Sequence, residues 1–586
     1  MQIDAISHRC FFAGCYPSEQ EIVINLLTGK DADKVFLVQE DPYIAGISGR
    51  HPWEGVPVLM RAERELERNI LWSAVIRPKY RRLQYYFEIA AGSERARLFE
   101  DRLYMESEWD GMVKEYFKFP WLHQTDVFRV PEWVKGTIWY QIMPDRFARG
   151  NAENKRMPLR EWGDEAGMQY GDFYGGDLRG IIGKLPYLRG LGITGIYLTP
   201  IFRSASNHKY NTDDYEQIDP DFGDEADIKE LVSTAHRAGI RVMLDAVFNH
   251  CGRGFAQWQD VVEKGERSPY FDWFFVQRTP VEPEGSTKDG RFYSFAFESG
   301  MPKLNTENPE VAAYLTGLCR KWVGEWQVDG LRFDVGNEIS HSFIKGLRRE
   351  LKRINPEVFL LGEIWHDASP WLLGDEYDGV MDYPFLAQLQ RFWEDKNENA
   401  RQLMYGLNRL YARYPRTVEP GLMRFLDSHD TIRAGSRCEN MDAFFGQLAL
   451  LLTMPGTPCI YYGTELAMKG ERNPYNRRCM PWEEIAQGKY DGVMKEVAAL
   501  IRLRKEHSQA VSGEVRWEPD ARFPRLVRYK KTDGDGAVLS VWIEAGEEPV
   551  PVRAEGKVLY SRKFADGILS PGGILIMKQE AEGWNR

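Results

Sequence analysis

The stretch Gly330-Leu331-Arg332-Phe333-Asp334 is a short apolar run that contains one arginine and ends in a carboxylate. Two further runs end in the same way: Leu361-Gly362-Glu363-Ile364-Trp365-His366 and Phe425-Leu426-Asp427-Ser428-His429-Asp430. Each run predicts a strand that carries a carboxylate at its C-terminal end. In a barrel of parallel strands these ends meet at one rim, so we expect Asp334, Glu363 and Asp430 to share one pocket.

Eight short apolar runs, separated by helix-length segments, lie between residues 137 and 462. They cover residues 137–142, 193–198, 241–245, 330–334, 358–363, 379–382, 422–427 and 457–462. This alternation is typical of βα units that build a parallel sheet. Because eight such strands close a TIM barrel, the sequence predicts a barrel domain over residues 131–505.

One connection in the predicted barrel is longer than a single crossover helix requires. Between the third strand, which ends at Asp245, and the fourth, which begins at Gly330, residues 251–305 are rich in aromatic residues, glycine and proline. A segment of this composition is an excursion from the barrel rather than one helix. We therefore expect a small lid domain after the third strand, over residues 251–305.

The segments that flank the barrel have the alternating pattern of antiparallel strands. Residues 1–125 contain runs such as Lys34–Val38 and Gln84–Ile89, which predict an N-terminal β-sandwich. Residues 510–586 contain two such runs around Asp533–Gly536, a sequence typical of a hairpin turn. The expected fold class is a multidomain chain with an N-terminal β-sandwich, a (β/α)8 TIM barrel with a lid, and a C-terminal antiparallel β-domain.

Composition argues against several classes of function. The 586 residues have a net charge of −11 and no basic stripe, so neither nucleic acid nor an anionic membrane is an expected partner. The first residues lack the basic and apolar regions of a signal peptide, and no segment is long enough to span a bilayer. Seven scattered cysteines without a C-x-x-C spacing favour reduced thiols and a cytoplasmic location.

Aromatic residues are unusually frequent, with 18 Trp, 28 Tyr and 30 Phe. Any single one of them is more often part of a core, but flat apolar faces with polar edges also suit carbohydrate rings. Metal catalysis has less support, because the histidines lack an H-E-x-x-H or comparable ligand spacing. Composition therefore favours a carbohydrate as the ligand.

Two of the strand-end carboxylates are expected to differ in their protonation. The period of two along a strand puts Arg332 and Asp334 on one face, where the guanidinium favours an ionised carboxylate suited to a nucleophile. Glu363 follows an apolar strand, a dry setting that is expected to raise its pKa and to suit a general acid. A single Asp–Arg pair at a strand end is more often structural, but the joint pattern predicts a retaining glycosidase with its two carboxyl groups about 5 Å apart.

These motifs resemble the four signature regions of the α-amylase family of glycoside hydrolases, in the family's order. The matching segments are residues 245–250, 330–334, 362–366 and 425–430. Within that family, Met301–Asn305, Val335–Glu338 and the added N-terminal β-domain resemble the branch that contains neopullulanase, cyclomaltodextrinase and maltogenic amylase. In this way the resemblance extends over the whole chain.

The resemblance implies a role for each matching residue. Asp334 would be the nucleophile, Glu363 the acid/base and Asp430 the third carboxylate, which stabilises the transition state. The residues expected to line the subsite of the attacked sugar are Arg332, His250 and His429, with Tyr210 stacked beneath the ring, and those expected to border the acceptor side are Glu338, Trp365 and His366.

The resemblance also implies substrates and a partner. The expected activity is retaining hydrolysis of α-1,4-glucosidic bonds in cyclodextrins, pullulan and short maltooligosaccharides, with transglycosylation as a second outcome. The N-terminal domain, which is similar to a carbohydrate-binding module, is expected to mediate a homodimer in which it covers the active site of the partner.

Relatives often carry a calcium site after the first barrel strand, and the matching candidates here are Asn151, Asn154, Gly175 and Asp177. Arg149 and Lys155 stand where two oxygen ligands would be expected. Because Ca²⁺ requires oxygen ligands, we expect the site not to hold calcium, and Arg149 or Lys155 to supply the charge instead. No cofactor is expected to be required.

Two alternatives remain from the sequence. One is an isomerase or transferase of the same family that acts on sucrose or trehalose, and the other is a non-catalytic barrel that binds sugars. The N-terminal β-domain and Met301–Asn305 favour the hydrolase over the first, and the intact carboxylate trio argues against the second. The preferred substrate and the extent of α-1,6 cleavage are left open by the sequence, since both depend on loops at the rim.

Overall fold

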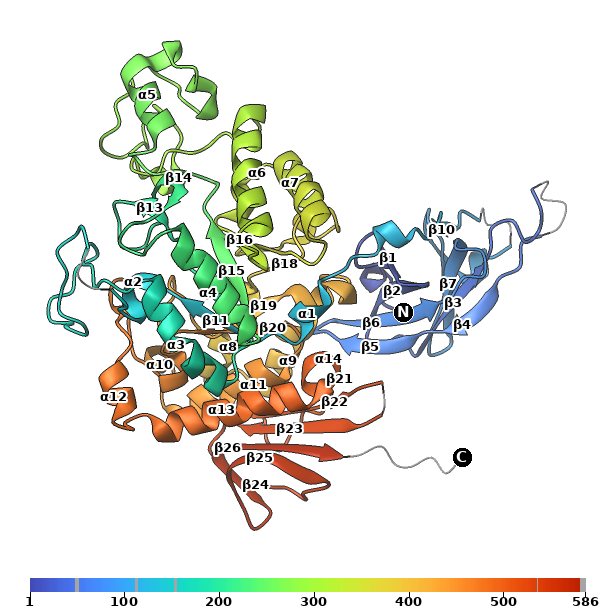
Figure 1. Cartoon of the computed structure of the whole chain (residues 1–586). Coiled ribbons are helices and arrows are strands. Elements are labelled where there is room, and N and C mark those ends of the chain that lie inside the picture. The colour runs from blue at the N-terminus through green and yellow to red at the C-terminus, as the bar shows by residue number, and fades with distance from the viewer. Residues whose placement is uncertain (48–51, 111–113, 152–154, 535, 580–586) are drawn as a thin grey trace. The chain divides into compact units, whose positions relative to one another are not determined.

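The computed structural model describes residues 1–47, 52–110, 114–151, 155–534 and 536–579 (Figure 1). Contacts group the chain into two compact units, one formed by Met1–Arg129 with Asn399–Glu419 and the other by Val130–Glu398 with Pro420–Arg586. No helix in the described ranges is both long and apolar enough to cross a membrane.

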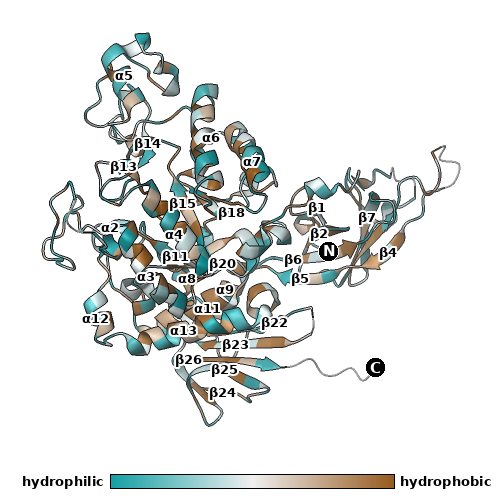
Figure 2. Cartoon of the chain, viewed as in Figure 1, coloured by the Kyte–Doolittle hydropathy of each residue, from teal (hydrophilic) through white to brown (hydrophobic). Residues whose placement is uncertain are grey.

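The N-terminal domain consists of two antiparallel sheets, as the sequence predicts. One sheet has the order β1 (Cys15–Ser18), β2 (Glu21–Gly29), β6 (Asn69–Ile76) and β5 (Arg61–Glu65). The other has the order β4 (Val56–Leu59), β3 (Lys34–Glu40), β7 (Leu83–Ala91), β8 (Glu94–Leu98) and β9 (Leu103–Met105), with β10 (Phe117–Phe119) paired to β7. Hydrophobic residues follow the strands of both sheets (Figure 2).

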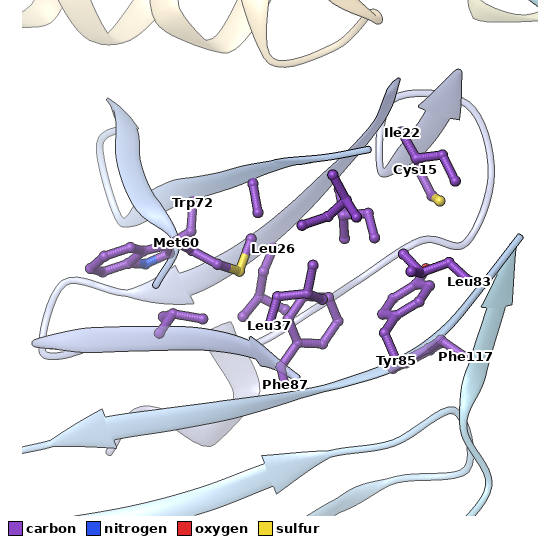
Figure 3. Packing of buried hydrophobic residues seen from close by; sticks show 14 of the residues in the cluster. Cys15, Ile22, Leu26, Leu37, Met60, Trp72, Leu83, Tyr85, Phe87 and Phe117 are labelled. Atoms are coloured by element: carbon purple, nitrogen blue, oxygen red, sulfur yellow. The ribbon is translucent and has the colours of Figure 1, made fainter. Parts of the chain in front are cut away.

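Side chains from the facing sheets meet in one core, which Figure 3 shows. Leu26 of β2, Leu37 of β3 and Phe87 of β7 are fully buried there. Since alternate residues of a strand point to opposite faces, the period-two pattern of the sequence fills this space from both sides. Helix α9 (Ala400–Tyr411) belongs to the same unit, and the Tyr405 hydroxyl donates to Glu65 at 3.0 Å.

Eight parallel strands form the barrel, which confirms the predicted fold. Their order is β18 (Gly379–Val380), β17 (Phe359–Gly362), β16 (Gly330–Phe333), β15 (Arg241–Ala246), β12 (Gly195–Leu198), β11 (Trp139–Ile142), β20 (Thr457–Tyr461) and β19 (Met423–Phe425). The seam between β18 and β19 is closed by one parallel bridge, between Met381 and Met423. A Cβ on Gly379 would lie 1.8 Å from the carbonyl oxygen of Gly421, so the chains approach closely at this seam.

The barrel strands are buried on both faces, which explains their continuous apolar sequences. The helices of this unit around the sheet are α3 (Leu178–Leu191), α4 (Glu225–Arg237), α6 (Pro309–Gly324), α7 (His341–Ile354), α8 (Tyr383–Glu394), α11 (Met441–Thr453) and α13 (Asp491–Glu506). Side chains cap several of their first turns. The Asp177 carboxylate accepts the Gly180 N–H at the start of α3, and Asp224 with Asp227 forms a capping box on α4.

The lid forms where the long connection after β15 was predicted. It contains α5 (Ala256–Lys264) and a set of isolated bridges, among them Val276 with Phe292 and Ser294 with Pro302. In Figure 1, α5 lies beyond the hairpin of β13 (Phe202–Ser204) and β14 (Thr212–Ile218). The hairpin follows the C-terminal end of β12 and the lid follows the C-terminal end of β15, so both leave the barrel at the same edge.

The C-terminal domain is an antiparallel sheet, as the sequence predicts. Its order is β21 (Glu514–Trp517), β22 (Leu526–Thr532), β23 (Val538–Glu544), β26 (Ile568–Gln579) and β24 (Val550–Pro551), with β25 (Lys557–Ala565) paired to β26. Helix α11 lies against this sheet, and its residues Phe444–Thr453 are all buried. A helix that is apolar all round is covered on every side, here by the barrel and the C-terminal sheet.

Candidate active site

The candidate site lies at the ends of neighbouring barrel strands. Asp334 follows β16 directly, Glu363 follows β17, and Asp245 lies near the end of β15. Register aligns Asp245 with Arg332, and Phe333 with Gly362, so the functional groups of three strands lie at one level. Parallel pairing, rather than proximity in sequence, brings these carboxylates together.

Arg332 connects the three carboxylates. Its Nη1 donates to Asp334 Oδ1 at 2.8 Å and to both oxygens of Asp245 at 3.0 Å. Its Nη2 lies 2.8 Å from Glu363 Oε2, in the geometry of an ion pair rather than an aligned hydrogen bond. The arginine side chain is completely buried, so the site holds one cation among three acidic groups.

Burial dominates the protonation of Asp334. It raises the pKa of this carboxyl well above the usual range, and the Arg332 guanidinium offsets the shift only in part. The expectation from sequence considered the guanidinium alone and was therefore incomplete. Glu363 and Asp245 add further repulsion to a negative charge on Asp334.

Glu363 is buried, as its expected dry setting requires, but hydrogen-bond donors surround its carboxyl group. The Val335 N–H donates to Oε2 at 2.9 Å, while the Trp365 indole N–H and the Tyr383 hydroxyl approach Oε1 at 3.1 Å and 3.3 Å. Val335 adopts a left-handed conformation with a φ of 46°, which is strained for a β-branched residue. That turn directs its N–H toward Glu363.

Asp430 lies nearer to solvent than the other two carboxylates, with a side chain that is 30% exposed. His429 Nε2 is 3.0 Å from Asp430 Oδ2, and Arg477 Nη2 is 3.4 Å from Oδ1. The amide of Gln141 lies 2.7 Å from His429 Nδ1. Burial lowers the pKa of His429 well below its usual value, so the imidazole is neutral and can accept from Gln141 while it donates to Asp430.

Tyr210 connects His429 to the arginine cluster. Its ring is stacked on the His429 imidazole, with centroids 5.2 Å apart and planes 5° from parallel. Its hydroxyl donates to Asp245 Oδ2 at 2.9 Å, and the same oxygen accepts the Tyr197 hydroxyl at 2.6 Å. Since the Tyr210 ring is held at its edge and on one face, it forms a fixed aromatic wall of the site.

His250 is buried and neutral. Burial lowers its pKa to about 3, and its Nε2 has no hydrogen-bond partner among the described residues. Its ring stacks on Phe295 of the lid, with centroids 5.0 Å apart. An unpartnered imidazole nitrogen of this kind is available to a hydroxyl group.

The three residues expected on the acceptor side lie on the rim. Trp365 is 52% exposed and stacks on Tyr383, with centroids 3.7 Å apart. Glu338 is paired with Lys303 at 3.2 Å, and Lys303 also donates to Asn249. His366 is exposed, and its ring lies beside Trp371 with centroids 5.8 Å apart.

Sequence reasoning missed several residues that contact the predicted ones. They are Gln141, Tyr197, Asp245, Tyr383 and Arg477. Asp245 could have been found from the sequence, because it ends the third predicted strand and begins the matching segment 245–250. Tyr383 and Arg477 could not have been found in this way. They lie in segments without a recognisable motif, and only the folded structure brings them to the site.

The residues at the candidate calcium position hold an ammonium group instead. Lys155 Nζ donates to Asp177 Oδ2 at 2.8 Å and to the Asp221 carbonyl at 2.5 Å. Asp177 also accepts the N–H groups of Gly150 and Asn151, both at 2.9 Å, and Gly175 takes the positive φ that its turn requires. Asn154 lies outside the described residues. With Lys155 on Asp177, the donor set does not fit a calcium ion.

Arg149 has a different position from Lys155. It donates to the carbonyl groups of Tyr174 and Arg160, each at 2.6 Å, and so holds the loop rather than the Asp177 carboxylate. Of the two cations expected to stand in for the ion, Lys155 is the one in contact with Asp177. No group of three or more His, Cys, Asp or Glu side chains suited to a metal occurs in the part of the chain that the structure describes.

Comparison with known proteins agrees with this architecture. Residues 141–507 match the catalytic domain of alpha amylase, and residues 1–123 match the N-terminal ig-like domain of alpha amylase. A cyclomaltodextrinase from Geobacillus thermopakistaniensis is 43% identical over 568 residues, which cover 95% of this chain and 94% of that protein. An intracellular maltogenic amylase from Bacillus subtilis is 40% identical over 523 residues, which cover 88% and 87%.

A solved structure of a cyclomaltodextrinase has a TM-score of 0.87 to this chain at 33% identity, and covers 99% of this chain and 98% of its own. The family match extends over most of the barrel, and the curated relatives extend over nearly the whole chain. These matches show that the chain belongs to the α-amylase family of glycoside hydrolases.

Proposed function

We propose that this enzyme is a retaining hydrolase of α-1,4-glucosidic bonds in cyclodextrins, pullulan and short maltooligosaccharides. The observation that carries the proposal is the pairing of Asp334 and Glu363 with one guanidinium at the rim of the barrel. Two carboxyl groups held this close fit a covalent, retaining mechanism. The names of its relatives, a cyclomaltodextrinase and a maltogenic amylase, support the choice of substrates.

In the proposed mechanism, Asp334 attacks the anomeric carbon while Glu363 gives its proton to the departing glycosidic oxygen. The C–O bond to the leaving sugar breaks as the bond to Asp334 forms. Glu363 then removes a proton from water, which attacks the anomeric carbon and releases Asp334. Arg332 keeps both groups oriented and balances the charge that moves between them.

Neutral side chains would hold the sugar that is attacked. His250, with its unpartnered Nε2, and His429 beside Asp430 are suited to ring hydroxyls, and Tyr210 is suited to the apolar face of the ring. We assign Asp430 the role of holding hydroxyls in a distorted ring, because its partially exposed carboxylate faces solvent beside His429.

The acceptor side suits a second sugar as well as water. The exposed Trp365 ring, supported by Tyr383, is a platform for a pyranose, and Glu338 and His366 are placed on the same rim. A sugar hydroxyl bound there would intercept the covalent intermediate and form a new glycosidic bond. Transglycosylation is therefore part of the proposal.

The substrate proposal is tested by incubation of the wild type and Glu363→Gln with β-cyclodextrin, pullulan and soluble starch, followed by chromatography of the products. We expect β-cyclodextrin to open to maltose and glucose faster than starch is cut, with no products from the variant. Sucrose and trehalose serve as the comparison panel. Products from that pair, with none from the three glucans, would favour the isomerase alternative.

The roles of the two carboxylates are separable with an activated substrate. α-Maltosyl fluoride has a leaving group that needs no protonation, so Glu363→Ala should still release fluoride in a first turnover. Asp334→Ala should not, because it lacks the nucleophile, but azide should restore fluoride release with inversion at the anomeric carbon. Equal loss in both variants, without azide rescue, would contradict the assignment.

We propose a homodimer formed through the N-terminal domain. Its surface exposes Tyr43, Ile44 and Ile47, the last at 94%, and the nearby Arg82 lies over both the Tyr43 and the Trp121 rings. Exposed apolar side chains clustered on one loop are typical of an interface. Sedimentation equilibrium should give a dimer for the wild type and a monomer for Ile44→Asp/Ile47→Asp. Val75→Asp, at an exposed position of β6, is the control and should remain a dimer.

We also propose that the enzyme needs no calcium and functions in the cytoplasm. The ammonium of Lys155 beside Asp177 supports the first statement. For the second, all seven cysteines are described and unpaired, as expected in a reducing compartment, and one relative is named an intracellular maltogenic amylase. Cell fractionation and activity in the presence of a chelator test the two statements separately.

A further inference from the structure

A cavity with a volume of about 450 Å³ lies between the barrel and the C-terminal sheet. Its walls come from the end of α8, the start of α11 and the chain that leaves β23. None of its lining residues belongs to the carboxylate site at the barrel rim. The volume falls in the range of about 300–1,000 Å³ that is typical of small-molecule sites.

Trp393 and Ile543 form an apolar wall of this cavity, and both pack against a glycine. Trp393 of α8 and Ile543 of β23 both lie over Gly446 of α11, and a Cβ at position 446 would be 3.2 Å from a carbon of each. The indole ring is half-buried and packs edge-on against Phe392. This arrangement fixes a flat aromatic surface at the side of the cavity, which suits the C–H face of a pyranose.

The cavity also holds a polar group without a partner. Glu544 is 3% exposed, and its Oε1 accepts the Gly546 N–H at 2.5 Å. Its Oε2 has no hydrogen-bond partner among the described residues. Burial raises the pKa of this carboxyl to about 7. Because a buried oxygen without a donor is unfavourable, a ligand hydroxyl that reaches it would be favoured.

The charges around the cavity argue for a neutral ligand. Glu439, Asp442 and Glu547 lie around it and are matched in number by Lys396, Lys563 and Arg525. The lysines are paired with Glu439 and Asp442 at 3.3 Å and 2.5 Å, and Arg525 donates to the carbonyl groups of Phe392, Glu398 and Ala545. An anionic ligand would have to compete with the carboxylates and carbonyl groups that already hold these cations, and a purely apolar ligand would leave Glu544 unsatisfied. A neutral polyol with one apolar face satisfies both conditions.

We propose that this cavity is a non-catalytic carbohydrate site that binds one or two glucose units of an α-glucan against Trp393 and Glu544. The choice of a sugar ring comes from the cavity itself, whereas the choice of an α-glucan rests on the proposed function. Such a site would hold a long chain at the enzyme while a distant segment of it enters the barrel. Its effect is then greater for long substrates than for short ones.

Calorimetric titration counts the sites directly. The inactive Glu363→Gln protein is titrated with β-cyclodextrin and with maltoheptaose, and we expect two binding events per chain, of which the weaker belongs to the cavity. Adding Trp393→Ala or Glu544→Ala should remove that event or weaken it at least tenfold. Lys557→Ala, at an exposed position of the same sheet, should leave both events unchanged.

Kinetics provide an independent readout in the active enzyme. Trp393→Ala should raise KM for soluble starch about threefold to tenfold and leave hydrolysis of maltotriose within twofold of the wild type. One binding event per chain in the Glu363→Gln protein, or two that persist in both cavity variants, would overturn the proposal. So would equal losses on starch and maltotriose, which would indicate a structural role for Trp393.

The titration separates this proposal from the proposed function. If the enzyme failed to cleave any α-glucan, a binding event sensitive to Trp393 would still support the cavity. If the enzyme cleaved cyclodextrins and the cavity event were absent, the cavity proposal alone would fail.

Discussion

Arg332 donates to Asp334 through Nη1 at 2.8 Å, and the same nitrogen serves Asp245. The second terminal nitrogen lies at Glu363, so one planar group fixes the positions of three carboxylates. A guanidinium can do this because its donors diverge in one plane, whereas an ammonium presents a single point of charge.

We therefore expect Arg332→Lys to lose most of its activity. The shorter, single-point cation cannot serve Asp245, Asp334 and Glu363 together, so kcat should fall about 100- to 10,000-fold with little change in secondary structure. Steady-state kinetics on β-cyclodextrin measure this. Arg241→Lys, which keeps a charge near Asp329 away from the rim, is the control and should stay within twofold.

Asp334→Asn should stabilise the protein near neutral pH. Burial and two neighbouring carboxylates raise the folded pKa of Asp334, so its contribution to stability is present at low pH and is lost as the pH rises through the folded value. Replacing the charge with an amide removes this penalty, and we expect Tm to rise by about 2 °C at pH 7.5. Calorimetry at pH 4.5 should show a smaller difference, and a lower Tm at both pH values would contradict the interpretation.

Lys155→Ala should destabilise the barrel unit. Lys155 and Asp177 are both nearly buried, and removal of one partner leaves the Asp177 carboxylate with one donor fewer, at a cost of about 3–5 kcal/mol. Lys135→Ala removes an exposed pair with Glu132 and should cost less than about 1 kcal/mol.

The effect of Ca²⁺ on Tm tests the same pair of residues, Lys155 and Asp177, in a second way. The Tm of the wild type should be the same in EDTA and in millimolar Ca²⁺. Lys155→Asp replaces the cation with an oxygen ligand, so its Tm should rise when Ca²⁺ is added. A wild type that loses stability in EDTA would contradict the substitution of the ion by Lys155.

His8 should make the N-terminal domain sensitive to acid. It is enclosed by Tyr85, Phe87 and Phe117, and burial lowers its pKa to about 4 from the usual 6.5. The contribution of the neutral imidazole is complete above pH 6.5 and is lost as the pH falls through 4, up to about 3 kcal/mol. Urea unfolding of His8→Gln should show a smaller loss between pH 6.5 and 4, while His123→Gln, exposed in the same unit, should behave as the wild type.

Much of the fold could be predicted from the sequence because its signals are local. Barrel strands such as β16 and β17 are buried on both faces, so their continuous apolar runs stand out between amphipathic helices. The positions of Asp334 and Glu363 follow from the same signal, since each lies one residue beyond a strand. Parallel register then brings them to one level without further information.

The surroundings of these carboxylates could not be predicted in the same way. Tyr383 reaches Glu363 only because β18 pairs with β17, which brings the residues after these two strands together, and the left-handed turn at Val335 is not visible in its side chain. Protonation was predicted least well, because it depends on the balance between burial and several charges rather than on one neighbour. The alternative between Arg149 and Lys155 likewise required atomic distances.

The seam between β18 and β19 has a mechanical consequence for catalysis. Two glycines in close approach, one bridge and the ion pair of Asp382 with Arg424 at 3.0 Å join the sheet there, whereas its other strands share longer ladders. Tyr383, the next residue after Asp382, donates to the proposed acid and supports Trp365. Any movement of β18 relative to β19 would displace Tyr383, and with it a hydrogen-bond donor of Glu363 and the ring that supports Trp365. The least reinforced pair of strands in the barrel is therefore coupled both to the proton donor and to the acceptor side.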